Sequence, residues 1–133
     1  MEKRRIKPHV DDNENTKGYS MESHATVKYL RSAPTKARLV ADAVRGMQVG
    51  NALAHLDYSI KKAVSHDIAK LLKSAVANMQ SRNSDANIDI DTVRIKEIRV
   101  DKGPVLRRFR ARARGRAGRI TKPMCHISVT LTD

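Results

Sequence analysis

The chain has few aromatic residues and little cysteine. It contains no Trp, one Phe and three Tyr among 133 residues, and its single Cys excludes an internal disulfide. Proteins that bind single strands by stacking many bases on aromatic platforms use more aromatic side chains than this. We therefore expect a protein of a reducing compartment that recognises its partner through charge and shape.

Long hydrophobic runs are missing as well. No apolar segment of this sequence approaches the roughly 20 residues that a helix needs to cross a bilayer, and residues 1–10 are too charged for a secretory signal. A membrane-active cationic peptide is disfavoured, because no apolar face or interfacial aromatic residues lie beside the charge. The sequence predicts a cytoplasmic protein with no membrane partner.

Acidic residues are absent from residues 102–122, which hold nine basic residues. The whole chain has a formal net charge of +13, so the other residues, 18 basic and 14 acidic, contribute only four. Such a run repels itself and has little apolar material to bury, which indicates a nucleic-acid partner rather than a merely solvated charge run. The basic residues are Lys102, Arg107, Arg108, Arg110, Arg112, Arg114, Arg116, Arg119 and Lys122.

The rest of the chain has the composition of one domain with appendages. The whole chain is 40% hydrophobic, which is enough to fill a modest core. Residues 1–23 are polar and without periodicity, which predicts a disordered tail. We expect a single domain over 24–133, with a globular body at 24–101 and 123–133 and an extended arm at 102–122.

Three helices are predicted between residues 32 and 83. The first follows Ser32 as N-cap, has Pro34 in its first turn and ends at Gly46. The third is opened by Ser59 and closes near Arg82. The apolar positions are Leu39, Val40, Ala43 and Val44 in the first helix, Ala52, Leu53 and Leu56 in a short second one, and Ile60, Val64, Ile68, Leu71, Leu72, Ala75, Val76 and Met79 in the third.

Strands flank these helices and the basic run. Ala25, Val27 and Tyr29 alternate with polar neighbours, and so do Ile127, Val129 and Leu131. Between them, Val93 and Ile95 are out of phase with Ile98 and Val100, which predicts a bulge near Lys96 and Glu97. The two strands that bracket the basic run predict an antiparallel hairpin with its tip near 112–116. Its reach is on the order of 30 Å.

Arginines on such a hairpin can bond phosphate oxygens in a forked geometry, which indicates nucleic-acid binding. Lys36, Arg38 and Arg45 of the first helix are further candidate contacts, whereas the lysines of the third helix have the pattern of a solvated face.

Catalysis is not indicated. Cys125 and His126 are neighbours in a strand, so their side chains point to opposite faces; we expect Cys125 to be buried and His126 partly exposed. Asp89 and Asp91 have no nucleophile or phosphate cradle nearby, and the other histidines lack ligand spacing. We expect no enzyme activity, no cofactor, no metal and no small-molecule substrate.

Residues 24–133 resemble the bacterial-type uL22 (L22) family of large-subunit ribosomal proteins. The resemblance is carried by Arg107, by Arg112-Ala113-Arg114-Gly115-Arg116 and by the sequence HISVTL at 126–131. Further matches are SAPTKARLVADAVRG at 32–46, KSAVAN at 73–78 and KEIRVDKGP at 96–104. Ala111 stands where relatives often have Pro, Gly118 replaces a usually larger residue, and Met47-Gln48 stands where a basic pair is common.

The resemblance implies an α+β fold, with three helices packed on a small antiparallel sheet and a long protruding basic β-hairpin. It implies a structural role in organising large-subunit ribosomal RNA during assembly, as a monomer beside neighbouring large-subunit proteins. The hairpin tip would line the polypeptide exit tunnel and meet the nascent polypeptide in passing. The tip residues are Arg110, Ala111, Arg112, Ala113, Arg114, Gly115 and Arg116.

A DNA-bending architectural protein with basic β-arms is the alternative from another class. Such proteins usually place paired arms on a dimer and a wedge residue at each tip. The apolar residues here suffice for a monomeric body, and no convincing wedge stands at the tip.

Overall fold

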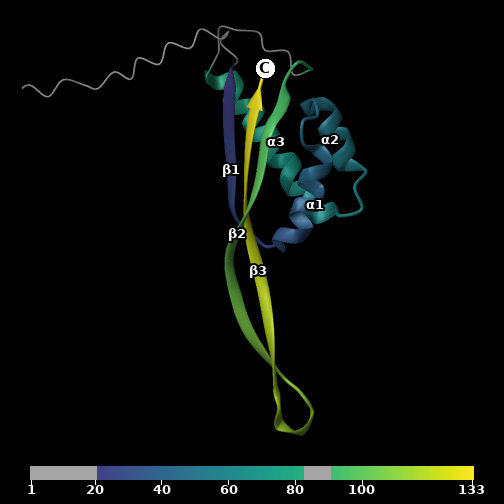
Figure 1. The fold of residues 1–133 in the computed structure, drawn as a ribbon, viewed down its shortest axis with the longest axis vertical. Helices are drawn as coiled ribbons and strands as arrows, with labels where there is room; N and C mark the ends of the chain where they lie inside the picture. The colour runs from purple at the N-terminus through teal and green to yellow at the C-terminus, as the bar shows by residue number, and fades with distance from the viewer. Residues whose placement is uncertain (1–20, 83–90) are drawn as a thin grey trace, which may run out of the picture.

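A computed structural model describes residues 21–82 and 91–133 of the chain. Its order of elements is β1 (Glu22–Leu30), α1 (Pro34–Val44), α2 (Val49–Asp57), α3 (Lys62–Arg82), β2 (Arg94–Ala111) and β3 (Ala117–Thr132). The strands form one antiparallel sheet in the order β1-β3-β2. The helices cover one part of this sheet, and β2 and β3 continue far beyond them as a bare hairpin (Figure 1). This confirms the predicted α+β fold.

The core lies between the three helices and the sheet, and α3 contributes the largest share of it among the helices. Helix α3 buries one face made of residues spaced three and four apart, among them Ile68, Leu72 and Met79. The opposing strand residues Ile127, Val129 and Leu131 are almost completely buried, as their alternation predicted. Each fully buried aliphatic side chain of this kind contributes about 1.5–3 kcal/mol to folding. Among the described residues, the members of the hydrophobic core all lie in the body.

Helix α1 differs from its prediction in two respects. Ser32 does not cap it: the N-cap is Ala33, no side chain caps the helix, and Pro34 opens it. Ser32 N instead donates to Leu30 O at 2.8 Å, in the turn that leaves β1. The buried face is also rotated from the predicted one: Leu39 and Ala43 are exposed, and Ala37, Val40, Ala41 and Val44 are buried.

The two alanines explain the rotation of α1. Helix α1 packs on β2, and small side chains at Ala37 and Ala41 allow the helix backbone to lie close to the strand. Gly46 follows the helix with a φ of 76°, the left-handed conformation predicted for its end.

The start of α3 was also predicted wrongly. Ile60 is 98% exposed, and the helix begins at Lys62 rather than after Ser59. Ser59 N donates to Leu56 O at 3.2 Å, so Ser59 belongs to the turn that ends α2. Ile60 continues the helical spacing of the sequence, but the backbone at this point is still in that turn.

Three irregularities shape the sheet. Ile95 pairs with Leu131 and Glu97 with Thr130, so Lys96 is the extra residue of a bulge at the predicted position. A second register shift lies between Lys102 and Val105. The bulge at Lys96 keeps residues on both sides of it in the core.

The third irregularity was not predicted. It lies between Val27 and Leu30, where Tyr29 has a φ of 59°. The prediction placed Tyr29 on the face of Ala25 and Val27, but Tyr29 is 62% exposed and Leu30 packs against the core instead. The bulge reverses the alternation at this point.

Strand β1 begins earlier than expected. Glu22 and Ser23, assigned to the disordered tail by sequence, pair with Thr132 and Leu131 of β3. Ser23 is fully buried, and its hydroxyl donates to Ala75 O of α3 at 2.7 Å. Residues 1–20 of the predicted tail, and Asp89, lie outside the described residues.

Candidate nucleic-acid interface

The hairpin becomes a free two-stranded ribbon where β1 ends. The last pair between β1 and β3 joins Leu30 and Cys125. Beyond it, β2 and β3 pair only with each other, from Val105 opposite Pro123 to Ala111 opposite Ala117. Within the part of the chain that the structure describes, both edges of this ribbon therefore lack a neighbouring strand. We call residues 103–123 the arm; it coincides closely with the segment that lacks acidic residues.

A glycine marks the base of the arm. A Cβ on Gly103 would lie 3.1 Å from the Met124 carbonyl carbon and oxygen, so a larger residue would push the two strands apart by a few tenths of an ångström. Nearby, Tyr29 N donates to His126 Nδ1 at 2.9 Å, and the two rings meet edge to face with centroids 4.9 Å apart. This hydrogen bond and ring contact therefore hold the last residues of β1 against β3 at the point where the arm leaves the body.

The tip of the arm is a tight turn over Ala113–Arg116. Arg116 N donates to Ala113 O at 3.4 Å, and Arg112 N donates to Arg116 O at 2.7 Å. Arg114 and Gly115 have φ values of 58° and 69°, as in the mirror-image turns that suit the twist of a hairpin. The left-handed conformation costs a residue such as Arg114 roughly 1–2 kcal/mol.

The position of the tip agrees with the prediction, and Ala111 continues β2 up to the turn. The structure also explains why a glycine suits position 118. A Cβ at this position would lie 3.1 Å from Nε and 3.2 Å from Cγ of Arg112, so the missing side chain leaves room for the Arg112 side chain.

The arm carries its cations on both faces. Phe109 pairs with Arg119 and Arg108 with Ile120, and residues directly opposite in a ladder share a face. Arg107 and Arg119 therefore lie on one face, and Arg108, Arg110 and Lys122 lie on the other. All five are exposed. A flat partner on one side could not reach both sets.

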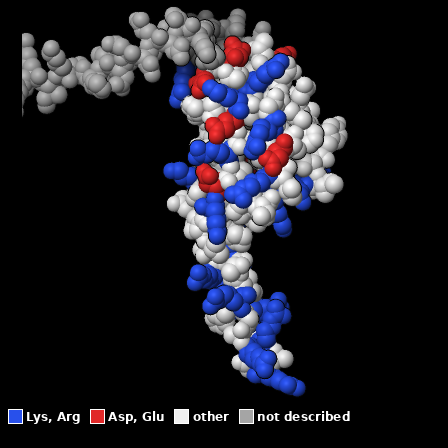
Figure 2. Space-filling model, viewed as in Figure 1, with Lys and Arg blue, Asp and Glu red and all other residues white. Residues whose placement is uncertain are grey.

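The body and the arm differ in how their charges are compensated. Figure 2 shows acidic side chains interspersed with basic ones on the body, whereas the arm carries basic ones alone. In the body, Asp42 pairs with Arg45 at 3.0 Å, Asp101 with Arg99 at 3.5 Å, and Glu22 with Lys96. Among the residues that the structure describes, the basic residues of the arm have no ion-pair partner.

Two pKa shifts have local causes, and neither creates a reactive group. A hydrogen bond from Lys96 and its charge hold the pKa of Glu22 below the ordinary value of 4.5. Burial raises the pKa of the Cys125 thiol above the ordinary 9.0, which keeps the thiol neutral. Cys125 is fully buried and His126 half-buried, as predicted from their alternation.

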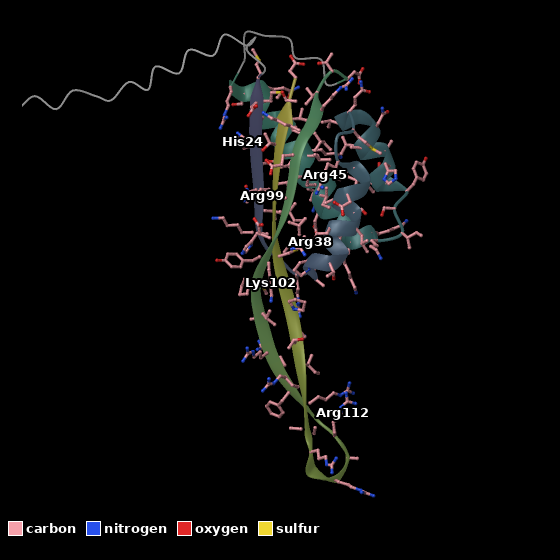
Figure 3. The ribbon with its side chains drawn as sticks, in the orientation of Figure 1. His24, Arg38, Arg45, Arg99, Lys102 and Arg112 are labelled. Atoms are coloured by element: carbon pink, nitrogen blue, oxygen red, sulfur yellow. The ribbon has the colours of Figure 1, made fainter. Side chains whose placement is uncertain are left out.

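The candidates on α1 and at its C-cap lie apart from the arm, and two of the three already donate to backbone carbonyls. The Arg38 guanidinium donates to Val100 O at 3.2 Å, and the Arg45 guanidinium donates to Ile98 O at 3.3 Å (Figure 3). Both carbonyls are on β2. Ile95 of this strand and Val93, just before it, also hydrogen-bond with residues 47–49 on the same edge. Lys36 is exposed. Sequence reasoning missed the role of the two arginines, because no local pattern reveals which distant carbonyl an arginine reaches.

Groups of three or more potential metal ligands are absent from residues 21–82 and 91–133. Over the same residues, none of the helices has the length and apolar character needed to cross a membrane.

Comparison with known proteins identifies the family. Residues 25–132 match the family described as Ribosomal protein L22p/L17e. The chain is 50% identical to the large ribosomal subunit protein uL22 of Anaeromyxobacter sp. (strain K) over 108 residues, which are 81% of this chain and 72% of that protein. It is 50% identical to uL22 of Chloroflexus aggregans over 85% of this chain and 96% of the relative, and 48% identical to uL22 of Syntrophus aciditrophicus over 85% and 99%. The chain therefore belongs to the uL22 family of large ribosomal subunit proteins.

Proposed function

We propose that this protein is a structural constituent of the large subunit of the cytoplasmic ribosome. It binds and organises large-subunit ribosomal RNA by inserting the arm between RNA segments. Family membership supports the ribosomal role. The single observation that supports the mode of binding is the ribbon with cations on both faces, no acidic residue and no core of its own.

The charge arrangement favours RNA that surrounds the arm. Arginine forks on two opposite faces can bond phosphates of two different segments, which would hold those segments at a fixed separation. The proposed RNA contacts on the arm and beside it are Lys102, Arg107, Arg108, Arg110, Arg112, Arg114, Arg116, Arg119 and Lys122, with Lys36 and the exposed part of Arg38 on α1.

The tip has a second proposed role. Residues 110–116 lie farthest from the body (Figure 1), so they would reach deepest into the particle and line the polypeptide exit tunnel. The passing nascent chain would meet the turn at Arg114 and Gly115. The body would remain among neighbouring ribosomal proteins as a single copy, without enzyme activity.

The salt dependence of RNA binding tests the role of the arm. Replacing Arg112, Arg114 and Arg116 together by Ala removes up to three phosphate contacts. The slope of log affinity for large-subunit RNA against log salt should then become shallower by about 2 to 3. The thermal midpoint of the body should stay nearly unchanged, because the tip contributes nothing to the core.

A matched control removes the same charge from the body. Lys61, Lys70 and Lys73 are exposed on or next to α3, and their joint replacement by Ala should change the slope less than the tip variant does. Equal slopes for the two triple variants would show that net charge, not the arm, determines binding. An unaltered slope in the tip variant would exclude the tip as a contact region.

A further inference from the structure

The only phenylalanine of the chain has an uncovered ring. Phe109 is 81% exposed and lies on the arm, opposite Arg119. Apolar surface is more stable when removed from water, so an exposed aromatic ring beyond the core suggests a partner that covers it. Within the described residues, the hydrophobic core lies in the body and does not include Phe109.

The surroundings of the ring define the chemistry of that partner. Phe109 lines an open hollow on the arm, together with residues of both strands. Ala117 and Gly118 contribute little side chain, so the hollow is wide beside the ring. Three arginines complete its lining, and two of them, Arg107 and Arg119, lie on the same face of the arm as the ring. The lining residues are Arg107, Arg108, Phe109, Ala117, Gly118 and Arg119.

A single nucleotide combines the features that this hollow would bind. Its base offers a flat π-face to the ring, and its phosphate offers negative charge to the arginines. An acidic peptide would satisfy the arginines but offers no flat surface as a regular feature. The base must be unpaired, because paired bases keep their faces stacked within the RNA helix.

We propose that Phe109 is a stacking site for one unpaired RNA base, with Arg107 and Arg119 binding the adjacent phosphates on the same face of the arm. This rests on the proposed function, because the arm must already lie in RNA. It adds a base contact to an interface otherwise made of phosphate contacts. One ring is compatible with the low aromatic content, which argues against a platform of several stacked bases.

Two probes of equal phosphate number separate stacking from charge. We would measure binding of the full chain to a 12-nucleotide oligoadenylate and to an oligonucleotide of the same length whose sugars carry no bases. Phe109→Ala should weaken oligoadenylate binding by at least about fivefold and leave binding of the abasic probe unchanged. Phe109→Tyr should retain the affinity, whereas Phe109→Leu, which is apolar but not aromatic, should lose most of the difference.

Each other outcome has a defined meaning. If wild-type protein binds both probes equally, or if Phe109→Leu binds like wild type, stacking at this position is excluded. Arg107→Ala should weaken binding of the oligoadenylate and of the abasic probe to the same degree. If the Phe109 variants have no effect while the triple tip variant still lowers the salt slope, the stacking site fails and the proposed function of the arm stands.

Discussion

At the scale of single residues, two buried serines differ in whether their hydroxyl groups are satisfied. Ser23 and Ser65 are 0% and 1% exposed. Ser23 Oγ donates to Ala75 O, whereas Ser65 Oγ has no hydrogen-bond partner in the structure. A buried polar group without a partner costs free energy, and one with a partner contributes a modest gain.

Replacing each serine by Ala should therefore change stability in opposite directions. Ser65→Ala should raise the free energy of unfolding by about 1 kcal/mol, because it removes an unsatisfied hydroxyl and Ala is the better helix former. Ser23→Ala should lower it by about 1 kcal/mol, because the Ala75 carbonyl loses its donor. Urea unfolding of both variants checks this. A loss of stability in both would mean that the Ser65 hydroxyl has a bonding role.

The buried thiol of Cys125 gives a second prediction at this scale. Because burial raises its pKa above 9.0, its contribution to stability is complete below pH 9 and is lost as the pH rises through the folded-state value. A thiol-specific reagent at pH 8 should therefore label native protein far more slowly than protein in urea. Rapid labelling of the native protein would show that the strand at Cys125 opens readily.

At the scale of elements, helix α1 protects the outer edge of β2. Arg38 and Arg45 donate to two successive outward carbonyls of that strand. An edge strand otherwise presents unpaired carbonyl groups to solvent and to other chains. The two arginines therefore stabilise the edge of the sheet, and this role does not depend on what their other nitrogens bind.

Arg38→Ala and Arg45→Ala should each lower the free energy of unfolding by about 0.5–1 kcal/mol, since these hydrogen bonds are partly exposed to solvent. Lys36→Ala is the control, because Lys36 lies on the same helix and has no side-chain partner among the described residues. Thermal unfolding without RNA provides the measurement. Equal melting of all three variants would show that the guanidinium groups do not stabilise the edge.

The elements also show which features can be predicted from sequence. The bulge at Lys96 was predictable, because the apolar residues on its two sides change phase in the sequence itself. The bulge at Tyr29 was not, because a tyrosine suits either face of a strand and its outward position depends on His126, far along the chain. The predicted N-cap at Ser32 was wrong for a similar reason: the turn that leaves β1 uses Ser32 and makes Ala33, which has no hydroxyl, the N-cap.

At the scale of the whole molecule, the body has a core and the arm has none. In free protein the arm is held only by the ladder between its two strands, and its positive charges repel one another. At physiological salt the screening length is about 8 Å, so neighbouring arginines still repel one another. The candidate site was predictable at this scale, because an uninterrupted run of one charge is visible in sequence, whereas its division between two faces required the register.

Amide hydrogen exchange should therefore divide the free protein into two parts. Amides of α3 and the central part of β3 should exchange slowly, at rates set by global unfolding, and those at 110–118 should exchange orders of magnitude faster. Addition of large-subunit RNA should slow the second group. Strong protection at 110–118 in the free protein would contradict the view that the arm becomes rigid only on binding.

The unpaired edges of the arm have a consequence for the chain before it meets its RNA. Two bare ribbons could add to each other strand by strand, which is the route by which exposed sheets aggregate. Closely spaced positive charges oppose that encounter between copies. The arginines that we propose to bind phosphate would thus also prevent newly made copies from polymerising before assembly.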